Sequence, residues 1–274
     1  MKRLLTLTGL SVVFLTSCQK EINNDFNNGN SSSGLLAKIG SKAGSDTTTT
    51  TFGYNSSQKL VSIGTEGISS GQSVNTTQRF VRNSQGIVTS IVSKSPSLAQ
   101  YGLDSLITVL HVDGSGKYTS RVTTIDLIIL IIRDSVALHY SGNNISSEVE
   151  FLDDGTGYLE FGKTEYTYSG NNIATAKVSS TDDNGVYQGD YYLLNYTYDD
   201  KVSPLIMGTE GIAIGYSNFF SANNVAKVVL DVPSDPSQNG TATNTYTYNT
   251  ANKPMTGISV DSGGASSKDT YTYQ

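Results

Sequence analysis

A hairpin-like motif recurs along most of this 274-residue chain at a nearly constant spacing. The segment Leu138–Ile145 (LHYSGNNI) returns almost unchanged as Tyr166–Ile173 (YTYSGNNI). The shared skeleton is an aromatic residue, a polar turn and an apolar residue. The last residues before the turns are Tyr54, Arg82, Val112, Tyr140, Tyr168, Tyr198, Phe220 and Tyr248, spaced 28 or 30 residues apart except for one interval of 22. Such a period is typical of stacked supersecondary units.

The repeat predicts an all-β fold over residues 51–274: a long antiparallel meander of about eight hairpins, curled towards a barrel. Asn and Gly cluster at each turn because they tolerate the positive φ angles that tight hairpins require. The composition agrees, since 17 tyrosines supply large rings for a β-sheet core. Two identical pentapeptides, Gly64–Ile68 and Gly208–Ile212, each begin ten residues after a tyrosine of the series, which favours equivalent positions in two hairpins.

Side-chain alternation predicts which face of each strand is buried. In the unit around Tyr140, one face should carry Val136, Leu138, Tyr140, Ile145, Val149 and Phe151. The polar face should carry Ser135, His139, Ser146, Glu148 and Glu150. The apolar run Ile125–Ile132 is expected to form a central strand covered on both faces.

The N-terminus has the pattern of a bacterial lipoprotein precursor. Lys2 and Arg3 precede an apolar run from Leu4 to Leu15, and Leu15-Thr-Ser-Cys18 closes it as a lipobox. We therefore expect residues 1–17 to be a signal peptide, and Cys18, the only cysteine, to anchor the protein to a membrane through lipid. Residues 18–50, rich in Asn, Ser, Gly and Thr, are expected to be a flexible tether.

Gln19-Lys20-Glu21 resembles the export tag that sends Bacteroidota lipoproteins to the cell surface. The Tyr-x-Tyr, turn, apolar skeleton resembles the YD-type hairpin repeats of bacterial surface proteins, although Asp follows the tyrosine only at Tyr198-Asp199. Taken together, these features resemble the uncharacterised Bacteroidota outer-membrane lipoproteins with a porin-like fold. The resemblance implies a barrel-like architecture and an outer-membrane, cell-surface location, and it carries over no catalytic residue.

The net charge of the chain bears on whether it binds nucleic acid, and the positions of two lysines bear on whether it spans a membrane. Once Lys2 and Arg3 are removed, 16 basic residues face 24 acidic ones, a net charge of −8 that disfavours nucleic acid as a partner. A membrane-spanning barrel stays open as an alternative, but Lys177 and Lys227 lie among apolar neighbours that would have to face lipid. A soluble or surface-lying β-sheet structure is therefore favoured.

Two kinds of residue are candidates for sites of ligand binding or modification. Six tyrosines of the repeat could stack into a platform for sugars or peptides, or they could form the core: Tyr166, Tyr168, Tyr196, Tyr198, Tyr246 and Tyr248. Thr47 lies in an Asp-Thr-Thr sequon of the Bacteroidota O-glycosylation type, within the expected tether.

Other motifs have simpler interpretations. His111 and His139 lack the further ligands of a zinc site. Ser69 lies in a Gly-x-Ser-x-Gly pattern, but the helix that a nucleophile elbow needs is missing. The acidic segment 182–190 could bind calcium, yet Asp is equally expected in hairpin turns.

These observations predict a protein without enzymatic activity or cofactor. The first hypothesis is a cell-surface lipoprotein with a binding or adhesion role, whose ligand is a glycan or a host protein. The alternative is a structural component of the envelope with no diffusible ligand.

Overall fold

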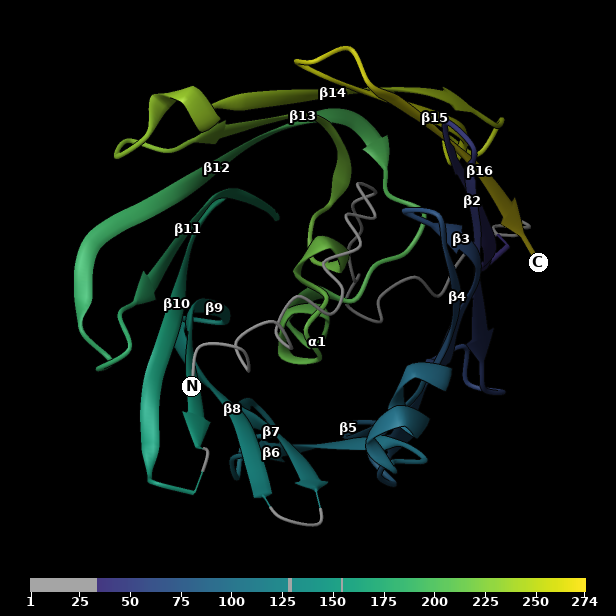
Figure 1. The fold of residues 1–274 in the computed structure, drawn as a ribbon. Coiled ribbons are helices and arrows are strands. Elements are labelled where there is room, and N and C mark those ends of the chain that lie inside the picture. Colours follow the sequence, from purple (N-terminus) through teal and green to yellow (C-terminus); the bar gives the residue numbers. More distant parts are fainter. Residues whose placement is uncertain (1–33, 128–129, 154) are drawn as a thin grey trace.

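In the computed structural model, residues 34–127, 130–153 and 155–274 are described, and they form a closed antiparallel barrel (Figure 1). Each strand pairs with its sequence neighbour, and β1 (Leu36–Ala43) pairs with β16 (Ser266–Tyr273) to close the ring. The predicted all-β meander is confirmed, and the sheet closes completely. The other strands are β2 (Asp46–Tyr54), β3 (Leu60–Ser69), β4 (Gln72–Arg82), β5 (Val88–Lys94), β6 (Leu106–Val112), β7 (Tyr118–Leu127), β8 (Leu130–Ser141), β9 (Asn144–Asp153), β10 (Tyr158–Ser169), β11 (Asn172–Thr181), β12 (Tyr187–Val202), β13 (Asn223–Asp231), β14 (Gly240–Tyr248) and β15 (Pro254–Asp261).

The expected boundary between tether and barrel at residue 50 is wrong. Residues 36–50 supply β1 and the first half of β2. Thr50 and Ile39 are paired with each other and are only 1% and 2% exposed, so this segment belongs to the barrel wall. The run Asp46–Thr51 looked like a polar linker, but threonine has high β-propensity and every second residue faces inward. Residues 1–33, with the expected signal peptide and Cys18, lie outside the described residues.

A β-bulge follows the same turn in every hairpin of the repeat. The register shifts next to Tyr54, Arg82, Val112, Tyr140, Tyr168, Tyr198 and Tyr248, and an eighth shift lies where Leu36 meets Tyr273 across the closing seam. An extra residue reverses which side chains point inward. Val149 and Phe151 are therefore outward, paired with Ala137 and Ser135, which corrects the expected face assignment.

A polar side chain from the next hairpin binds the backbone of an apolar residue beside each of these bulges. Tyrosine hydroxyls donate to the carbonyls of Leu36, Ile145, Ile173, Val225 and Pro254, from Tyr54, Tyr168, Tyr198, Tyr246 and Tyr273 respectively. Arg82 donates to Leu60, the Val88 N–H donates to Tyr118, and the backbone of Tyr118 hydrogen-bonds Tyr140. Because a bulge leaves backbone groups without ladder partners, these bonds satisfy groups that would otherwise be buried and unpaired. We call them the staple bonds.

Phe220 is not a hairpin landmark, contrary to the sequence prediction. It lies in residues 203–222, an insertion between β12 and β13 that contains the helix α1 (Gly208–Ala213) and a 3-10 turn at Ser217–Phe219. The insertion runs into the barrel interior (Figure 1). The pentapeptide Gly64–Ile68 lies in β3, whereas its identical copy Gly208–Ile212 lies in α1, so the two are not equivalent.

The run Ile125–Ile132 is not a strand covered on both faces. It spans the end of β7 and the start of β8, and residues 128–129 lie outside the described residues. Ile131 points outward and is 43% exposed, while its neighbour Ile132 pairs with Ile125 on the inner face. Ile125, Ile131 and Ile132 therefore belong to two paired strands that are covered on the inner face alone.

Replacing Tyr54 by Phe tests the staple bonds. The change removes the 2.9 Å bond from the Tyr54 hydroxyl to the Leu36 carbonyl and keeps the ring. We expect the free energy of unfolding, measured by urea denaturation, to fall by about 1 kcal/mol. Tyr101→Phe is the control, because Tyr101 is 41% exposed and should change stability by less than about 0.5 kcal/mol. Equal effects of the two changes would contradict a stapling role.

Candidate functional site

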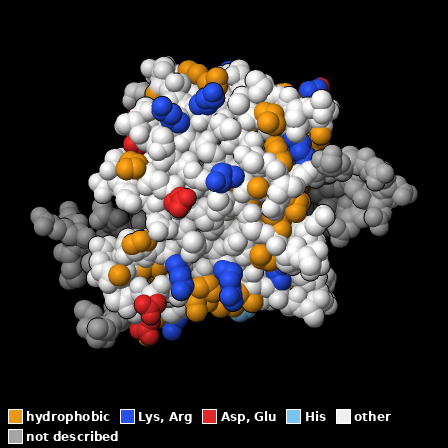
Figure 2. All heavy atoms as spheres, turned by 90° about the vertical axis from the view of Figure 1, so that its right-hand side faces the viewer, with side chains coloured by type: hydrophobic (Ala, Val, Ile, Leu, Met, Phe, Trp, Pro, Cys, Tyr) orange, Lys and Arg blue, Asp and Glu red, His pale blue; other side chains and the backbone are white. Residues whose placement is uncertain are grey.

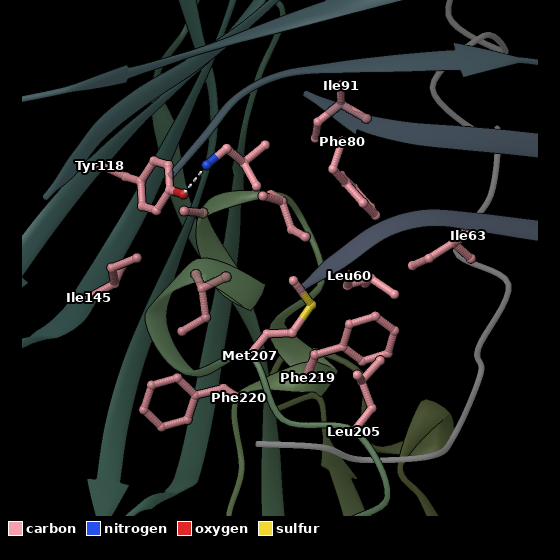
Figure 3. Close-up of a cluster of buried hydrophobic side chains, with 14 of the residues drawn as sticks. Leu60, Ile63, Phe80, Ile91, Tyr118, Ile145, Leu205, Met207, Phe219 and Phe220 are labelled. Carbon is pink, nitrogen blue, oxygen red and sulfur yellow. Dashed lines mark hydrogen bonds between the residues drawn. The ribbon is translucent and has the colours of Figure 1, made fainter. Parts of the chain in front are cut away.

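The insertion, residues 203–222, is the plug of the barrel. Its buried side chains include Leu205, Met207, Ile212, Phe219 and Phe220, which meet inward-facing residues of the wall (Figure 3). The Phe219 ring lies 6.4 Å from Phe52, and the Phe220 ring 5.0 Å from Tyr168. The apolar core is therefore shared between the wall and the plug.

A buried ion pair ties the plug to the wall. The Arg82 guanidinium on β4 makes two hydrogen bonds to the Glu210 carboxylate on α1, at 2.7 and 2.9 Å. The Arg82 and Glu210 side chains are 6% and 12% exposed. Tyr118 donates to the same carboxylate at 3.1 Å, and burial followed by the charge of Glu210 raises the pKa of Tyr118. The plug is thus held by charge as well as by packing.

Arg121 on β7 forms a second link to the plug. Its guanidinium lies 2.6 Å from the Glu148 carboxylate and donates to the Ile212 carbonyl of α1 at 3.1 Å. Tyr166 donates to the other oxygen of Glu148 at 2.5 Å. Burial lowers the pKa of Arg121, but the charge and hydrogen bond of Glu148 outweigh it and raise the pKa overall. Arg121 therefore stays charged and bonded.

Two further carboxylates lie beside this pair on the inner face. Burial raises the pKa of Asp134 on β8, and burial followed by the charge of Asp134 raises that of Glu150 on β9. The Oδ1 atom of Asp134 is buried without a hydrogen-bond partner. With Glu148 already bonded, the interior around Arg121 has more negative than positive groups.

The six tyrosines considered as a ligand platform line the interior of the barrel. Tyr166 is 9% exposed, and Tyr168, Tyr196, Tyr198, Tyr246 and Tyr248 are half-buried. They face inward because the Tyr-x-Tyr pattern places both rings on one side of the strand, with an exposed threonine between them. Tyr166 lies in the core, Tyr168 and Tyr196 pack against it, and the hydroxyls of Tyr168, Tyr198 and Tyr246 make staple bonds. These contacts favour the core interpretation of the six tyrosines over the exposed platform.

Thr47 lies in β2 rather than in a tether, so the flexible backbone that favoured glycosylation there is missing. Its side chain is exposed, in a shallow groove of about 470 Å³ on the outer face of β2–β4 that also contains Glu66 and Ile68. Figure 2 shows the side of the barrel that includes these strands, with scattered apolar and basic side chains on a mainly uncharged surface. Modification of Thr47 stays a prediction.

The remaining sequence candidates are not brought together. His111 and His139 point outward from β6 and β8, with β7 between them. Ser69 lies beside the β3–β4 hairpin turn, not on a strand-to-helix elbow. Asp182 accepts hydrogen bonds from the backbone of Asn184 and Val186, as a turn-forming Asp does. Within the described residues, no three His, Cys, Asp or Glu side chains are grouped as metal ligands.

A group of exposed aromatic and apolar side chains that the sequence did not predict lies at the edge of the barrel opposite the repeat turns. Tyr158 and Leu159 begin β10, Val186 precedes β12 and Tyr187 begins it; they are 59%, 40%, 54% and 37% exposed. We call these four residues the rim patch. Tyr158 and Tyr187 point to the outer face of the wall, like their partners Asp153 and Thr181, whereas Leu159 is paired with Leu152 on the inner face. These residues lie outside the Tyr-x-Tyr motifs, so the spacing of the repeat gave no signal that could have identified them.

Comparison with solved structures identifies the architecture. The chain is similar to a porin-like protein from Bacteroides uniformis, with a TM-score of 0.56 and 13% identity over 87% of this chain and 98% of that one. A porin-like protein from Bacteroides vulgatus gives 0.56 and 10% identity over 88% and 99%. At these identities the likeness establishes the fold alone. No family model and no curated protein matches the sequence. Among the described residues, no helix is long and apolar enough to cross a bilayer.

Replacing Glu210 by Gln tests how strongly the ion pair holds the plug. Arg82 would remain buried without an opposite charge, so we expect the free energy of unfolding to fall by about 3 kcal/mol. Asp200→Asn is the matched control: it breaks the pair of Asp200 with Lys201, and the Asp200 side chain is 83% exposed. The control should change stability by less than about 1 kcal/mol. Similar losses in the two variants would show that the buried pair contributes little.

Replacing Asp134 by Asn tests the buried carboxylates through pH. Because burial raises the pKa of Asp134 in the folded state, ionisation destabilises the fold as pH rises from about 4 through the raised value. The variant should therefore be more stable than the parent at pH 7, and the difference should shrink towards pH 3. Denaturation across this range measures it, with exposed Asp126→Asn as control. A gain that does not change with pH would contradict the assignment to ionisation.

Proposed function

We propose that this chain is a non-catalytic binding protein of the outer membrane, anchored by lipid at Cys18 with the barrel outside the bilayer. The observation that carries the proposal is a barrel plugged by its own chain that exposes an aromatic surface at one rim. Porin-like structural neighbours and the lipobox support the location. The binding role follows from the exposed aromatic rings, which soluble surfaces rarely group together without a partner.

The outer surface supports a barrel that does not span lipid. Lys163, Lys177 and Lys227 point outward from the middle of β10, β11 and β13. A lysine at the bilayer midplane of a barrel destabilises it by about 2–4 kcal/mol. The outward residues of β14 are all threonines, at 241, 243, 245 and 247. The wall also exposes apolar side chains, among them Ile107, Ile131 and Ile258. The lysines and threonines are suited to water, and a lipid on Cys18 would provide the attachment that they disfavour.

The interior supports a role other than that of an open pore. Barrels of 16 strands leave an aqueous channel unless something fills it. Here the plug buries Met207, Ile212 and Phe219 inside the wall, and Glu210 is paired with Arg82. A protein with this interior is better suited to presenting its surface than to conducting solutes.

A structural role in the envelope without a diffusible ligand is the second candidate. The use of the repeat tyrosines as core and staple residues favours it, because that leaves most of the surface without aromatic groups. The rim patch favours the binding role instead.

Replacing Cys18 by Ala tests the anchor. We expect the parent to remain in the membrane fraction after a carbonate wash and to be degraded when protease is added to intact cells. The variant should leave the membrane, because no lipid can be attached. Ser17→Ala serves as control, since it keeps a small residue before the cysteine. A washed variant that stays in the membrane would indicate a spanning barrel, and parent protein protected until lysis would place it in the periplasm.

A further inference from the structure

The rim patch lies on a firmly held part of the barrel edge. The Tyr187 hydroxyl donates to the Glu160 carboxylate at 2.6 Å, which joins the start of β12 to the start of β10 across the end of β11. Thr181 at the end of β11 donates to the Glu160 carbonyl at 2.8 Å. The three strand ends are therefore tied together, and the Tyr187 ring is held in place before any partner binds.

The turn that leads into β12 packs closely on β10. Gly185 has a φ of +77°, and a Cβ there would lie 2.7 Å from the Cδ1 of Leu159. Only glycine allows both this backbone conformation and this approach. Asp182 closes the turn by accepting hydrogen bonds from two backbone N–H groups and from the Gln188 side chain. The turn is thus a defined structure rather than a loose loop.

The charge around the patch is mainly negative. Glu160 accepts the hydrogen bond of Tyr187 and lies two residues from Tyr158 on the same face, Asp182 and Asp183 lie in the adjoining turn, and Asp190 lies in β12. An aromatic ring with carboxylates near it attracts cations, since the ring face carries negative charge density. The same strands already show this contact: the Lys177 ammonium lies 4.4 Å from the centre of the Tyr191 ring.

We propose that the rim patch is a docking surface for a segment of a partner protein rich in arginine and lysine. The inference rests on the proposed binding function and assigns it a place and a ligand chemistry. Guanidinium groups would stack on Tyr158 and Tyr187 and pair with Glu160 and the neighbouring aspartates. The apolar stems of these side chains would lie along the outward rings of Tyr158 and Tyr187. Anionic ligands are disfavoured by the same carboxylates.

A peptide-binding experiment on the full-length chain in detergent tests the proposal. The probe is fluorescent hexa-arginine, with hexa-glutamate and a neutral oligosaccharide as comparison ligands, and fluorescence anisotropy measures binding. We expect hexa-arginine to bind and its affinity to weaken as salt is added, because charge contributes to the contact. Tyr158→Ala combined with Asp183→Asn should weaken binding by about tenfold.

A matched variant separates the patch from general attraction to an acidic protein. Tyr101→Ala combined with Asp126→Asn removes one exposed tyrosine and one exposed carboxylate elsewhere on the barrel. It should leave the affinity for hexa-arginine within about twofold of the parent. Equal losses in the two double variants, or no binding of hexa-arginine, would overturn the proposal.

The results distinguish a failure of this docking proposal from a failure of the proposed function. If the neutral oligosaccharide binds instead and Tyr158→Ala abolishes its binding, the chain is a binding protein but the ligand class is wrong. If the Cys18→Ala protein stays in the membrane after washing, the proposed lipid-anchored location is wrong, whether or not hexa-arginine binds. Circular dichroism of each variant checks that the barrel remains folded.

Discussion

The width of a sixteen-stranded barrel is the constraint on which the rest of this structure depends. Side chains that point inward can fill a barrel of about eight strands, but they cannot meet across one of sixteen. This chain solves the problem with residues 203–222, which leave the wall after β12 and return before β13. The wall is not interrupted, because Val202 still pairs with Asn223. The plug thus supplies the opposite side of a core that the strands could not close by themselves.

The repeat solves a second problem, which is how to bend and close the wall. Each hairpin of the series carries a bulge directly beside its turn, and bulges increase the local twist and curvature of a sheet. The bulge needs a hydrogen-bond partner from outside the ladder, and a tyrosine of the following hairpin provides it, or Arg82 in the case of Leu60. This coupling explains why tyrosine recurs with the turn. It also explains the eighth unit, formed by Tyr273 and Leu36 from opposite ends of the chain.

The sequence predicted what the repeat encodes and failed where the repeat is broken. Turn residues and alternation were sufficient for the fold class and for the inward direction of Val136 and Leu138. A bulge is not visible in the sequence pattern, so the faces of Val149 and Phe151 were reversed. Glu210 could not be recognised either, since its pentapeptide is identical to one in a strand. Its conformation depends on Arg82, Tyr118 and the surrounding core, which are tertiary contacts.

Departures from the repeat are also where the candidate functional features lie. The motif tyrosines face the barrel interior, where several of them pack in the core or donate staple bonds, so they serve the fold rather than the outer surface. The interval of 50 residues between Tyr198 and Tyr248 contains the plug, and the 16-residue strand β12 extends to the rim patch. Neither feature is needed to form another hairpin. A repeat protein can therefore vary its partner through these segments while the stapled wall stays the same.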